Sequence, residues 1–336
     1  MVREQRGNGL IWRDDAKRGH VESYFLKFND PASGRALWIK FTICAPAGRP
    51  QDAVGETWAI YFDARDPSRM VGMKESFPLR ECRIRREPLR LEFGGSVFEP
   101  RGTTGGLRNA EGHGIKWNLA WTEGTEPLVL FPYAGMYTFR LPKSKVLTPY
   151  PDSRFGGTVE VDGTQWAVEG LPGMQGHNWG EEHAHYYGWV QGTVFDDGTE
   201  GFFEGFSGKV KIGPLVTPFV SMAFLRVGDR IWRFDGPSSW LSGKVDLVTD
   251  RWTFDIPGAT HRVRGEIGAP RERFAGLRYY DPTGRVSYCL NSKVSDARIE
   301  LVNRATGRVE RTLASTAGFA LEVLTKDPNH GVRMFA

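Results

Sequence analysis

Apolar and polar residues alternate in short runs along the whole chain, and Gly, Pro, Asp and Asn separate these runs. A helical period of apolar residues nowhere extends beyond about two turns. Tyr24–Phe28 and Leu37–Ile43 flank a connector rich in turn residues, which predicts a hairpin. A second hairpin is predicted for Val220–Val227 and Arg230–Phe234, because a Gly-Asp pair separates them. The pattern predicts an all-β fold with little helix, built from two antiparallel β-barrel or sandwich domains packed side by side.

Length and composition support two globular domains. The 336 residues are 40% hydrophobic and 25% charged, with 41 Gly, 20 Pro and 3 Cys, and a domain usually holds about 100–200 residues. A Gly- and Pro-dense stretch, Leu171–Gly176, predicts the boundary between an N-terminal domain, residues 1–176, and a C-terminal domain, residues 177–336. The glycine-rich residues 94–114 are predicted to form a long loop, a candidate for a mobile flap.

Cysteine spacing, hydropathy and charge limit the cellular environments and the binding partners that the sequence is compatible with. Cys44, Cys82 and Cys289 lie far apart, which favours a reducing, cytoplasmic location over a disulfide framework or a thiolate zinc site. No stretch reaches the ~18 apolar residues that cross a bilayer, so stable membrane insertion is not expected. The 44 basic and 40 acidic residues are spread along the chain, which argues against nucleic acid as a partner.

One stretch, residues 175–206, concentrates the candidate chemistry. Three histidines, His177, His183 and His185, fall within nine residues. If a strand begins at His183, the two-residue period places on one face His183, His185, Tyr187, Trp189, Gln191 and Thr193. The opposite face is then small and apolar, so the polar-aromatic face is the candidate site.

A hairpin turn at Asp197 and Gly198 would set Gln191 opposite Glu204 and Trp189 opposite Phe206. Glu204 would then lie among aromatic rings, where desolvation should raise its pKa and let it donate a proton near neutrality. Two other interpretations stay open: a glutamate that is exposed or paired with arginine, and aromatic side chains that serve only as core.

A metal site is a further alternative, because His-x-His on a strand puts two imidazoles on one face and His177 or a nearby Glu could complete the set. The sequence contains no G-x-S-x-G elbow, P-loop or strand-linked G-x-G-x-x-G unit. Serine hydrolysis, nucleotide binding and dinucleotide redox chemistry therefore lose their main support, and neither a metal nor a cofactor is expected.

The stretches Gly176–Gly180, Glu22–Lys27 and Leu37–Thr42 resemble the superfamily of hydroxyneurosporene synthase (carotenoid 1,2-hydratase), AttH-like proteins and tocopherol cyclase. The resemblance implies two lipocalin-like β domains and cofactor-free acid catalysis on isoprenoid or polyketide-like substrates in a deep apolar cavity near the domain junction. It also implies active-site roles for His177 and Trp179. The family's Tyr-x-Asp element corresponds here to Phe202-x-Glu204, and Gly176 stands where the hydratases are expected to carry Asp.

The combined expectation is a hydratase or cyclase, a lyase or isomerase, that protonates a bulky apolar substrate. Glu204 is the expected proton donor, and His177 is expected to orient the ligand, relay a proton or activate water. Aromatic rings would stabilise a carbocation. The expected partner is a hydrophobic small molecule, held by Trp179, Asn178, His185, Tyr187, Trp189, Gln191, Phe202 and Phe206. The alternative is a non-catalytic lipocalin-type carrier that uses the same cavity.

Overall fold

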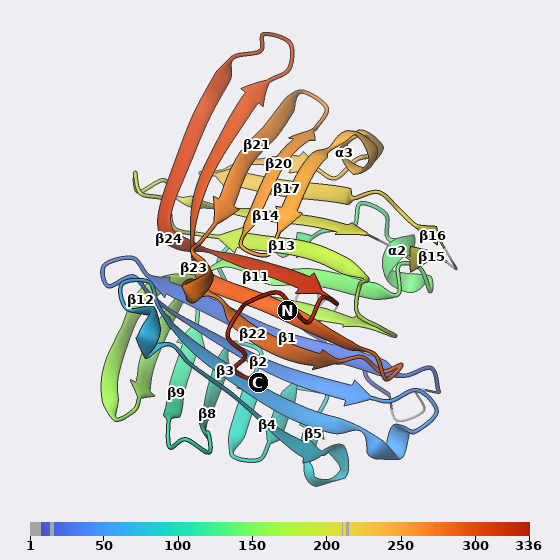
Figure 1. Cartoon of the computed structure of the whole chain (residues 1–336), viewed down its shortest axis with the longest axis vertical. Coiled ribbons are helices and arrows are strands. Elements are labelled where there is room, and N and C mark those ends of the chain that lie inside the picture. The colour runs from blue at the N-terminus through green and yellow to red at the C-terminus, as the bar shows by residue number, and fades with distance from the viewer. Residues whose placement is uncertain (1–7, 14–16, 210, 213–214) are drawn as a thin grey trace.

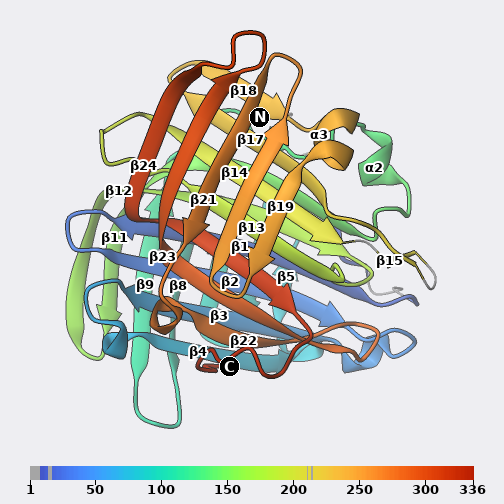
Figure 2. The same ribbon diagram turned by 45° about the horizontal axis from the view of Figure 1, so that its top comes forward.

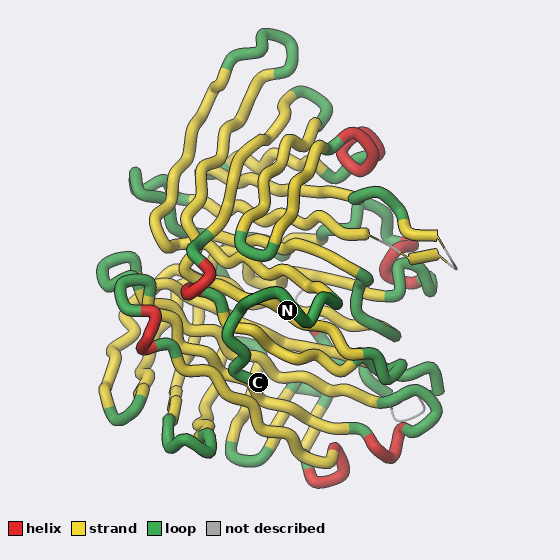
Figure 3. Tube along the Cα trace, viewed as in Figure 1, coloured by secondary structure: helices red, strands yellow, loops and turns green. Residues whose placement is uncertain are grey.

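The structure is a computed structural model that describes residues 8–13, 17–209, 211–212 and 215–336. Strands make up 61% of the chain and helices 7%. Two large curled antiparallel sheets stack on one another (Figure 1), and strands dominate the trace in Figure 3. The predicted all-β class with little helix, built from antiparallel sheets, is confirmed.

The first sheet holds 12 strands in the order β4-β3-β2-β1-β12-β11-β9-β8-β7-β6-β5, with β10 paired to β11. Its strands are β1 (His20–Asp30), β2 (Arg35–Ala45), β3 (Val54–Asp63), β4 (Val71–Pro78), β5 (Arg83–Arg85), β6 (Arg90–Phe93), β7 (Ser96–Glu99), β8 (Gly102–Arg108), β9 (Gly114–Trp121), β10 (Leu128–Val129), β11 (Ser144–Val161) and β12 (Thr164–Gly180).

The second sheet holds 10 strands in the order β18-β17-β14-β13-β24-β23-β21-β20-β19, with β22 paired to β23. Its strands are β13 (Tyr186–Gly192), β14 (Gly201–Lys209), β17 (Val220–Val227), β18 (Arg230–Phe234), β19 (Lys244–Val248), β20 (Arg251–Pro257), β21 (His261–Gly268), β22 (Ala275–Tyr280), β23 (Val286–Asn303) and β24 (Val309–Thr325). A separate small pair consists of β15 (Lys211–Ile212) and β16 (Leu215–Val216).

Short helices occupy the connections and sheet edges (Figure 2). They are η1 (Pro50–Asp52), η2 (Pro67–Arg69), η3 (Leu79–Glu81), α2 (Gly135–Thr138), α3 (Pro237–Ser242) and η4 (Arg271–Arg273). No described helix is long and apolar enough to cross a membrane.

The two sheets repeat one strand order. In the first, β1, β2, β3 and β4 follow outward from the long hairpin β11–β12; in the second, β13, β14, β17 and β18 follow outward from the long hairpin β23–β24. No internal repeat is evident in the sequence itself. The two sheets therefore share a strand topology although their amino-acid sequences differ.

The pattern of buried and exposed residues along a strand shows whether one or both of its faces are covered by other parts of the protein. In β9, Ile115, Trp117, Leu119 and Trp121 are buried and alternate with exposed residues, because only one face meets the core of the first sheet. In β1, nine consecutive residues are buried. This strand has the core of the first sheet on one face and the second sheet on the other, as Tyr24 and Phe25 show by joining different hydrophobic clusters.

Both predicted hairpins are confirmed. Strands β1 and β2 pair along their whole length, and β17 pairs with β18 across Gly228 and Asp229, with Gly228 at a φ of 56° that favours glycine. The predicted loop at residues 94–114 is wrong, since it forms β7 and β8 with short turns. Alternation is weak there because glycines replace side chains, as in Gly105, whose added Cβ would lie 2.5 Å from the Trp117 ring.

The predicted domain limits remain a prediction. Strand β12 continues beyond residue 176 to Gly180, and the second sheet begins at Tyr186 in β13. The change of sheet therefore falls within the dense stretch that the sequence singled out, and it divides the candidate residues between two sheets.

Candidate functional site

The pairing of β13 with β14 places Glu204 in the junction between the two sheets. Gln191 pairs with Glu204, and Trp189 pairs with Phe206, which is the predicted register. The predicted two-residue turn at Asp197 and Gly198 is wrong, because a longer connector, residues 193–200, joins the strands. The register survives because the small apolar face, with Val190, packs into the core of the second sheet.

Glu204 is fully buried and asymmetrically hydrogen-bonded. Its Oε1 accepts from Thr148 Oγ1 at 2.8 Å and from Trp189 Nε1 at 3.0 Å, whereas its Oε2 has no partner among the described residues. Burial raises the pKa of Glu204 from an ordinary 4.5 to about 7, although the hydrogen bonds from Trp189 and Thr148 and the charge of Lys27 act in the opposite direction. When the carboxyl is protonated, Oε2 carries the proton, because Oε1 already accepts two hydrogen bonds.

The rings predicted to surround Glu204 do share its face. Phe202 and Phe206 lie two residues away on β14, and Tyr187 stacks on Phe206 with ring centroids 5.7 Å apart. Gln191 is buried and donates from Nε2 to the carbonyl of Pro151 at 2.8 Å, which leaves its Oε1 without a partner in the described chain. Unsatisfied buried oxygens of this kind are typical of a site that water or a ligand completes.

A connector of the first sheet covers this face. Residues 122–143, here called the covering segment, contain β10 and α2 and link β9 to β11. Leu128, Leu130 and Phe131 of the covering segment pack with Phe202 and with side chains of β17. Tyr137 ties the segment down, since its Oη donates to the carbonyl of Val146 at 2.8 Å and accepts from the Phe131 amide at 3.2 Å.

Buried charges continue the polar part of the junction. Lys27 is fully buried on β1 and donates to Asn29 Oδ1 at 3.0 Å, and burial together with the charge of Lys293 lowers its pKa well below the usual lysine range. Lys293 donates to Glu322 Oε1 at 2.6 Å, and its ammonium lies 5.2 Å from the Trp189 ring centroid. The junction is thus a polar and aromatic interior, whereas the resemblance implies a deep apolar cavity there.

His177 lies on the other face of β12, which corrects the prediction that it shares a site with Glu204. An added Cβ at the neighbouring Gly176 would point at Phe25, which packs on Trp189 in the junction. His177 therefore points the opposite way, into the first sheet, where it stacks on Tyr24 at 4.2 Å and contacts Trp179 at 4.6 Å. Asn178 pairs with Val146, which packs with Phe202, so it shares the Glu204 face. Trp179 starts from the His177 face, but its ring lies 6.0 Å from that of Tyr137 in the covering segment.

His177 belongs instead to a network around Glu22. His177 Nε2 lies 2.9 Å from Glu22 Oε1, and Tyr24 Oη donates to the same oxygen at 2.9 Å. Glu22 also accepts from the backbone amides of Ile11 and Trp12 at 2.9 Å and 2.6 Å. Burial acts to raise the pKa of Glu22, but hydrogen bonds from His177 and His20 outweigh it and hold the pKa well below the usual range.

The other two histidines precede β13 and do not lie on its polar face, contrary to the prediction. The backbone amide of His183 donates to Asp281 Oδ2 at 2.9 Å, and His185 Nδ1 lies 2.9 Å from Lys326 Nζ. Within the described chain no group of three or more His, Cys, Asp or Glu is placed to hold a metal ion. The metal alternative required these histidines to converge, and they do not.

Sequence reasoning missed Thr148, Lys27 and Glu22. Thr148 and Glu22 contact predicted residues and the charge of Lys27 acts on Glu204, all from strands distant in sequence, so no local spacing links them to residues 175–206. A signal was present for two of them, because Glu22 and Lys27 are charged residues interspersed among the apolar residues of the predicted strand around Tyr24–Phe28. Charged residues are almost never fully buried unless paired or functional.

Comparison with known proteins shows the fold. No protein-family model and no curated protein sequence matches the chain. Kievitone hydratase from Nectria haematococca covers 90% of this chain with 88% of its own, at a TM-score of 0.53 and 8% identity. CghA with Sch210972 covers 92% of this chain with 88% of its own, at a TM-score of 0.58 and 11% identity. An AttH candidate from Nitrosomonas europaea covers 95% with 97% of its own, at a TM-score of 0.49 and 13% identity.

The resemblance inferred from Gly176–Gly180 and the first hairpin is therefore confirmed at the level of the fold. The chain shares the overall fold of kievitone hydratase and CghA. Identities of 8% and 11% leave the chemistry of each protein to its own side chains.

Proposed function

We propose that this chain is an enzyme, an acid-catalysed hydratase or cyclase that needs no cofactor and acts on a bulky apolar molecule of isoprenoid or polyketide type. The observation that carries the proposal is Glu204, a fully buried carboxyl whose pKa burial raises to about 7. A carboxyl of this kind is about half protonated near pH 7 and can donate a proton where ordinary glutamates are ionised. The hydratase name of one fold neighbour agrees with this chemistry.

The proposed step moves the proton from Glu204 Oε2 to one carbon of a C=C bond. The other carbon becomes cationic and the carboxyl becomes a carboxylate, so charge is conserved. In a hydratase, water adds to the cation and loses a proton to the carboxylate. In a cyclase, a second double bond or a hydroxyl of the same molecule closes the ring, and the proton that is lost returns to Glu204.

The side chains around Glu204 divide the remaining work. Thr148 and Trp189 hold Oε1 and thereby direct Oε2. Phe206 and Tyr187 offer ring faces to a cation, an interaction worth about 2 kcal/mol when desolvated. The Trp189 ring is less suited to that role than expected, because the Lys293 ammonium already lies near it.

Substrate access requires the covering segment to move. Glu204 has no exposed surface, and the apolar residues of β10 and the following turn pack over its face of the sheet. Segments of this kind exclude water during reaction and set the rate of product release in many enzymes. The exposed Phe139 and Leu141, 73% and 60% accessible, lie in the covering segment and would meet an apolar substrate first.

The experiment compares wild-type protein with Glu204→Gln on a metabolite extract of the host prepared in D2O. A hydratase gives a product enriched by the elements of D2O, and a cyclase gives an isomer of its substrate with deuterium at the protonated carbon. Both signals should vanish in Glu204→Gln and persist in the matched control Glu169→Gln, since Glu169 is exposed on β12.

Equal turnover by Glu204→Gln and wild type would refute the proposal. A carrier gives a different result, in which an apolar compound from the extract co-purifies unchanged with both proteins. The polar-aromatic lining of the junction also suits binding without chemistry, so this outcome would show that the protein is a carrier and not an enzyme.

A further inference from the structure

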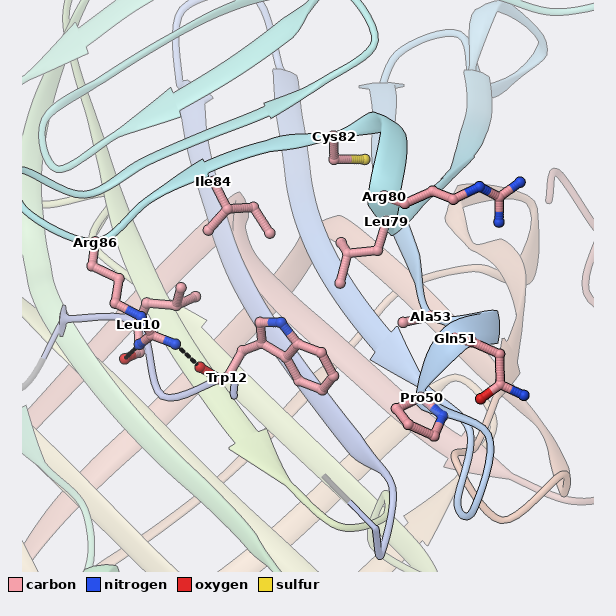
Figure 4. Close-up of a pocket in the computed structure, with 10 residues that line it drawn as sticks. All are labelled: Leu10, Trp12, Pro50, Gln51, Ala53, Leu79, Arg80, Cys82, Ile84 and Arg86. Carbon is pink, nitrogen blue, oxygen red and sulfur yellow. Dashed lines mark hydrogen bonds between the residues drawn. The ribbon is translucent and has the colours of Figure 1, made fainter. Parts of the chain in front are cut away.

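A pocket of about 580 Å³ opens in the first sheet, away from Glu204 (Figure 4). Residues 8–13, here called the N-terminal wall, form one side, and the turn at η1, the helix η3 and β5 with the residue after it form the others. Its lining residues are Leu10, Trp12, Pro50, Gln51, Ala53, Leu79, Arg80, Cys82, Ile84 and Arg86. The volume falls within the range of small-molecule sites, about 300–1,000 Å³.

The apolar lining continues the core of the first sheet. Trp12 and Ala53 belong to that core, and Leu79, Cys82 and Ile84 pack against it from the rim. The Trp12 indole lies centrally among these side chains in Figure 4. A flat or chain-like apolar group placed here would contact an aromatic ring and branched aliphatic side chains, which is the usual composition of a ligand pocket.

Hydrogen bonds hold the N-terminal wall from two sides. The Arg86 guanidinium donates to the backbone carbonyls of Leu10, at 3.0 Å, and of Trp12. Glu22 accepts from the amides of Ile11 and Trp12 on the other side of the same backbone. The wall is therefore preorganised, and less ordering free energy is lost when a ligand binds.

The charge of the lining is one-sided. Its ten residues include two arginines and no acidic residue. Arg86 is engaged by the two carbonyls, but Arg80 is 74% exposed at the rim, where its ion pair with Glu81 spans 3.5 Å. An exposed ion pair of this length contributes little to stability, so Arg80 can readily leave Glu81 for a better acceptor. A ligand carboxylate is such an acceptor, because a guanidinium binds it through two parallel hydrogen bonds.

We propose that this pocket is a second ligand site, one that takes an amphipathic carboxylate with its apolar part on Trp12, Leu79 and Ile84 and its anionic group at Arg80. The site is separate from the proposed acid catalysis, because Glu204 lies in the junction between the sheets. It also gives the His177–Glu22 network a role, since Glu22 positions the pocket wall through the backbone of Ile11 and Trp12.

Cys82 supplies the assay, because its thiol lines the pocket and is half-buried. The full-length protein is alkylated with iodoacetamide with and without dodecanoate, and peptide mass spectrometry follows Cys82 and Cys44 separately. Dodecanoate should slow alkylation of Cys82 and leave Cys44, which contacts the carbonyl of Tyr280, unchanged. Equal rates at Cys82 with and without dodecanoate would overturn the proposal.

Variants test the anion contact. Arg80→Glu should weaken dodecanoate binding about tenfold or more, the loss that corresponds to one charge-assisted hydrogen bond. The matched control is Arg83→Glu, an arginine on β5 that is 84% exposed and does not line the pocket, and this variant should bind as wild type. If both variants weaken binding equally, general surface charge explains the effect and the assignment to Arg80 is wrong. Glu204→Gln should leave dodecanoate binding unchanged, so the two proposals fail independently.

Discussion

Replacing Glu204 by Gln should make the protein more stable at alkaline pH than the wild type. The folded state binds the Glu204 proton up to about pH 7, whereas the unfolded chain releases it near the ordinary 4.5. Below pH 4.5 Glu204 is protonated in both the folded and the unfolded state, so its ionisation does not lower the free energy of unfolding. As pH rises from 4.5 to 7, only the folded state keeps the proton, so stability falls, and above 7 the loss is complete.

The magnitude follows from the pKa difference. A gap of about 2.5 pH units at 1.36 kcal/mol per unit corresponds to about 3 kcal/mol of unfolding free energy. Gln keeps the shape and an oxygen for Thr148 and Trp189 but carries no titrating proton. The difference in stability between Glu204→Gln and wild type should therefore be near zero at about pH 4.5 and grow to about 3 kcal/mol in favour of the variant at about pH 8.

Urea unfolding followed by far-ultraviolet circular dichroism, repeated across this pH range, measures the difference. Glu169→Gln serves as the control and should give a curve parallel to the wild type, because Glu169 is exposed. A constant difference between Glu204→Gln and wild type, or one that favours the wild type more at high pH, would refute the reasoning. Either result would also remove the main support for Glu204 as a proton donor.

Three further predictions concern the packing around the two sites. Gly176→Ala should destabilise by about 1–3 kcal/mol in thermal unfolding, because its Cβ would lie 2.3 Å from the Phe25 ring; an unchanged melting temperature would contradict this packing. Tyr137→Phe should cost about 1 kcal/mol and speed hydrogen exchange in the covering segment, and unchanged exchange there would show that its hydroxyl does not tie the segment down. Glu22→Ala should lower the free energy of unfolding by about 3–5 kcal/mol at neutral pH, measured by urea unfolding. The loss should be smaller in acid, because the stabilisation by the Glu22 carboxylate is lost as the carboxylate becomes protonated. Equal losses at neutral and acid pH would contradict an ionised Glu22.

Much of the Glu204 environment was predictable from period-two alternation. Once β13 and β14 pair, the small residues Gly188 and Val190 must face the second-sheet core, and that choice fixes Trp189 and Gln191 toward Glu204. A one-residue slip would have exposed the apolar face, so the register held although the turn was longer than expected.

The same alternation places on opposite faces of a strand residues that are close in sequence and were predicted to share one site. His177 lies next to Gly176 and Asn178, and a strand sends neighbours to opposite faces. Where β12 begins and which of its faces meets the second sheet depend on pairing with β1 and β11, whose residues are distant in the chain. The prediction that His177 and Glu204 act together failed for this reason.

By itself, the sequence determined the local properties: the all-β class, the strands with one apolar face, the Gly-Asp hairpin loop and the acid among aromatic residues on β14. These follow from each residue's preference for water or for the interior and from the geometry of short turns. Only the tertiary structure decided which distant groups meet. Thr148 donates to Glu204 from the first sheet, where the charge of Lys27 also acts on it, and Glu22 reaches His177 from the neighbouring strand β1. Burial between two sheets, which sets the charge of Glu204, is a property of the packed molecule and of no segment within it.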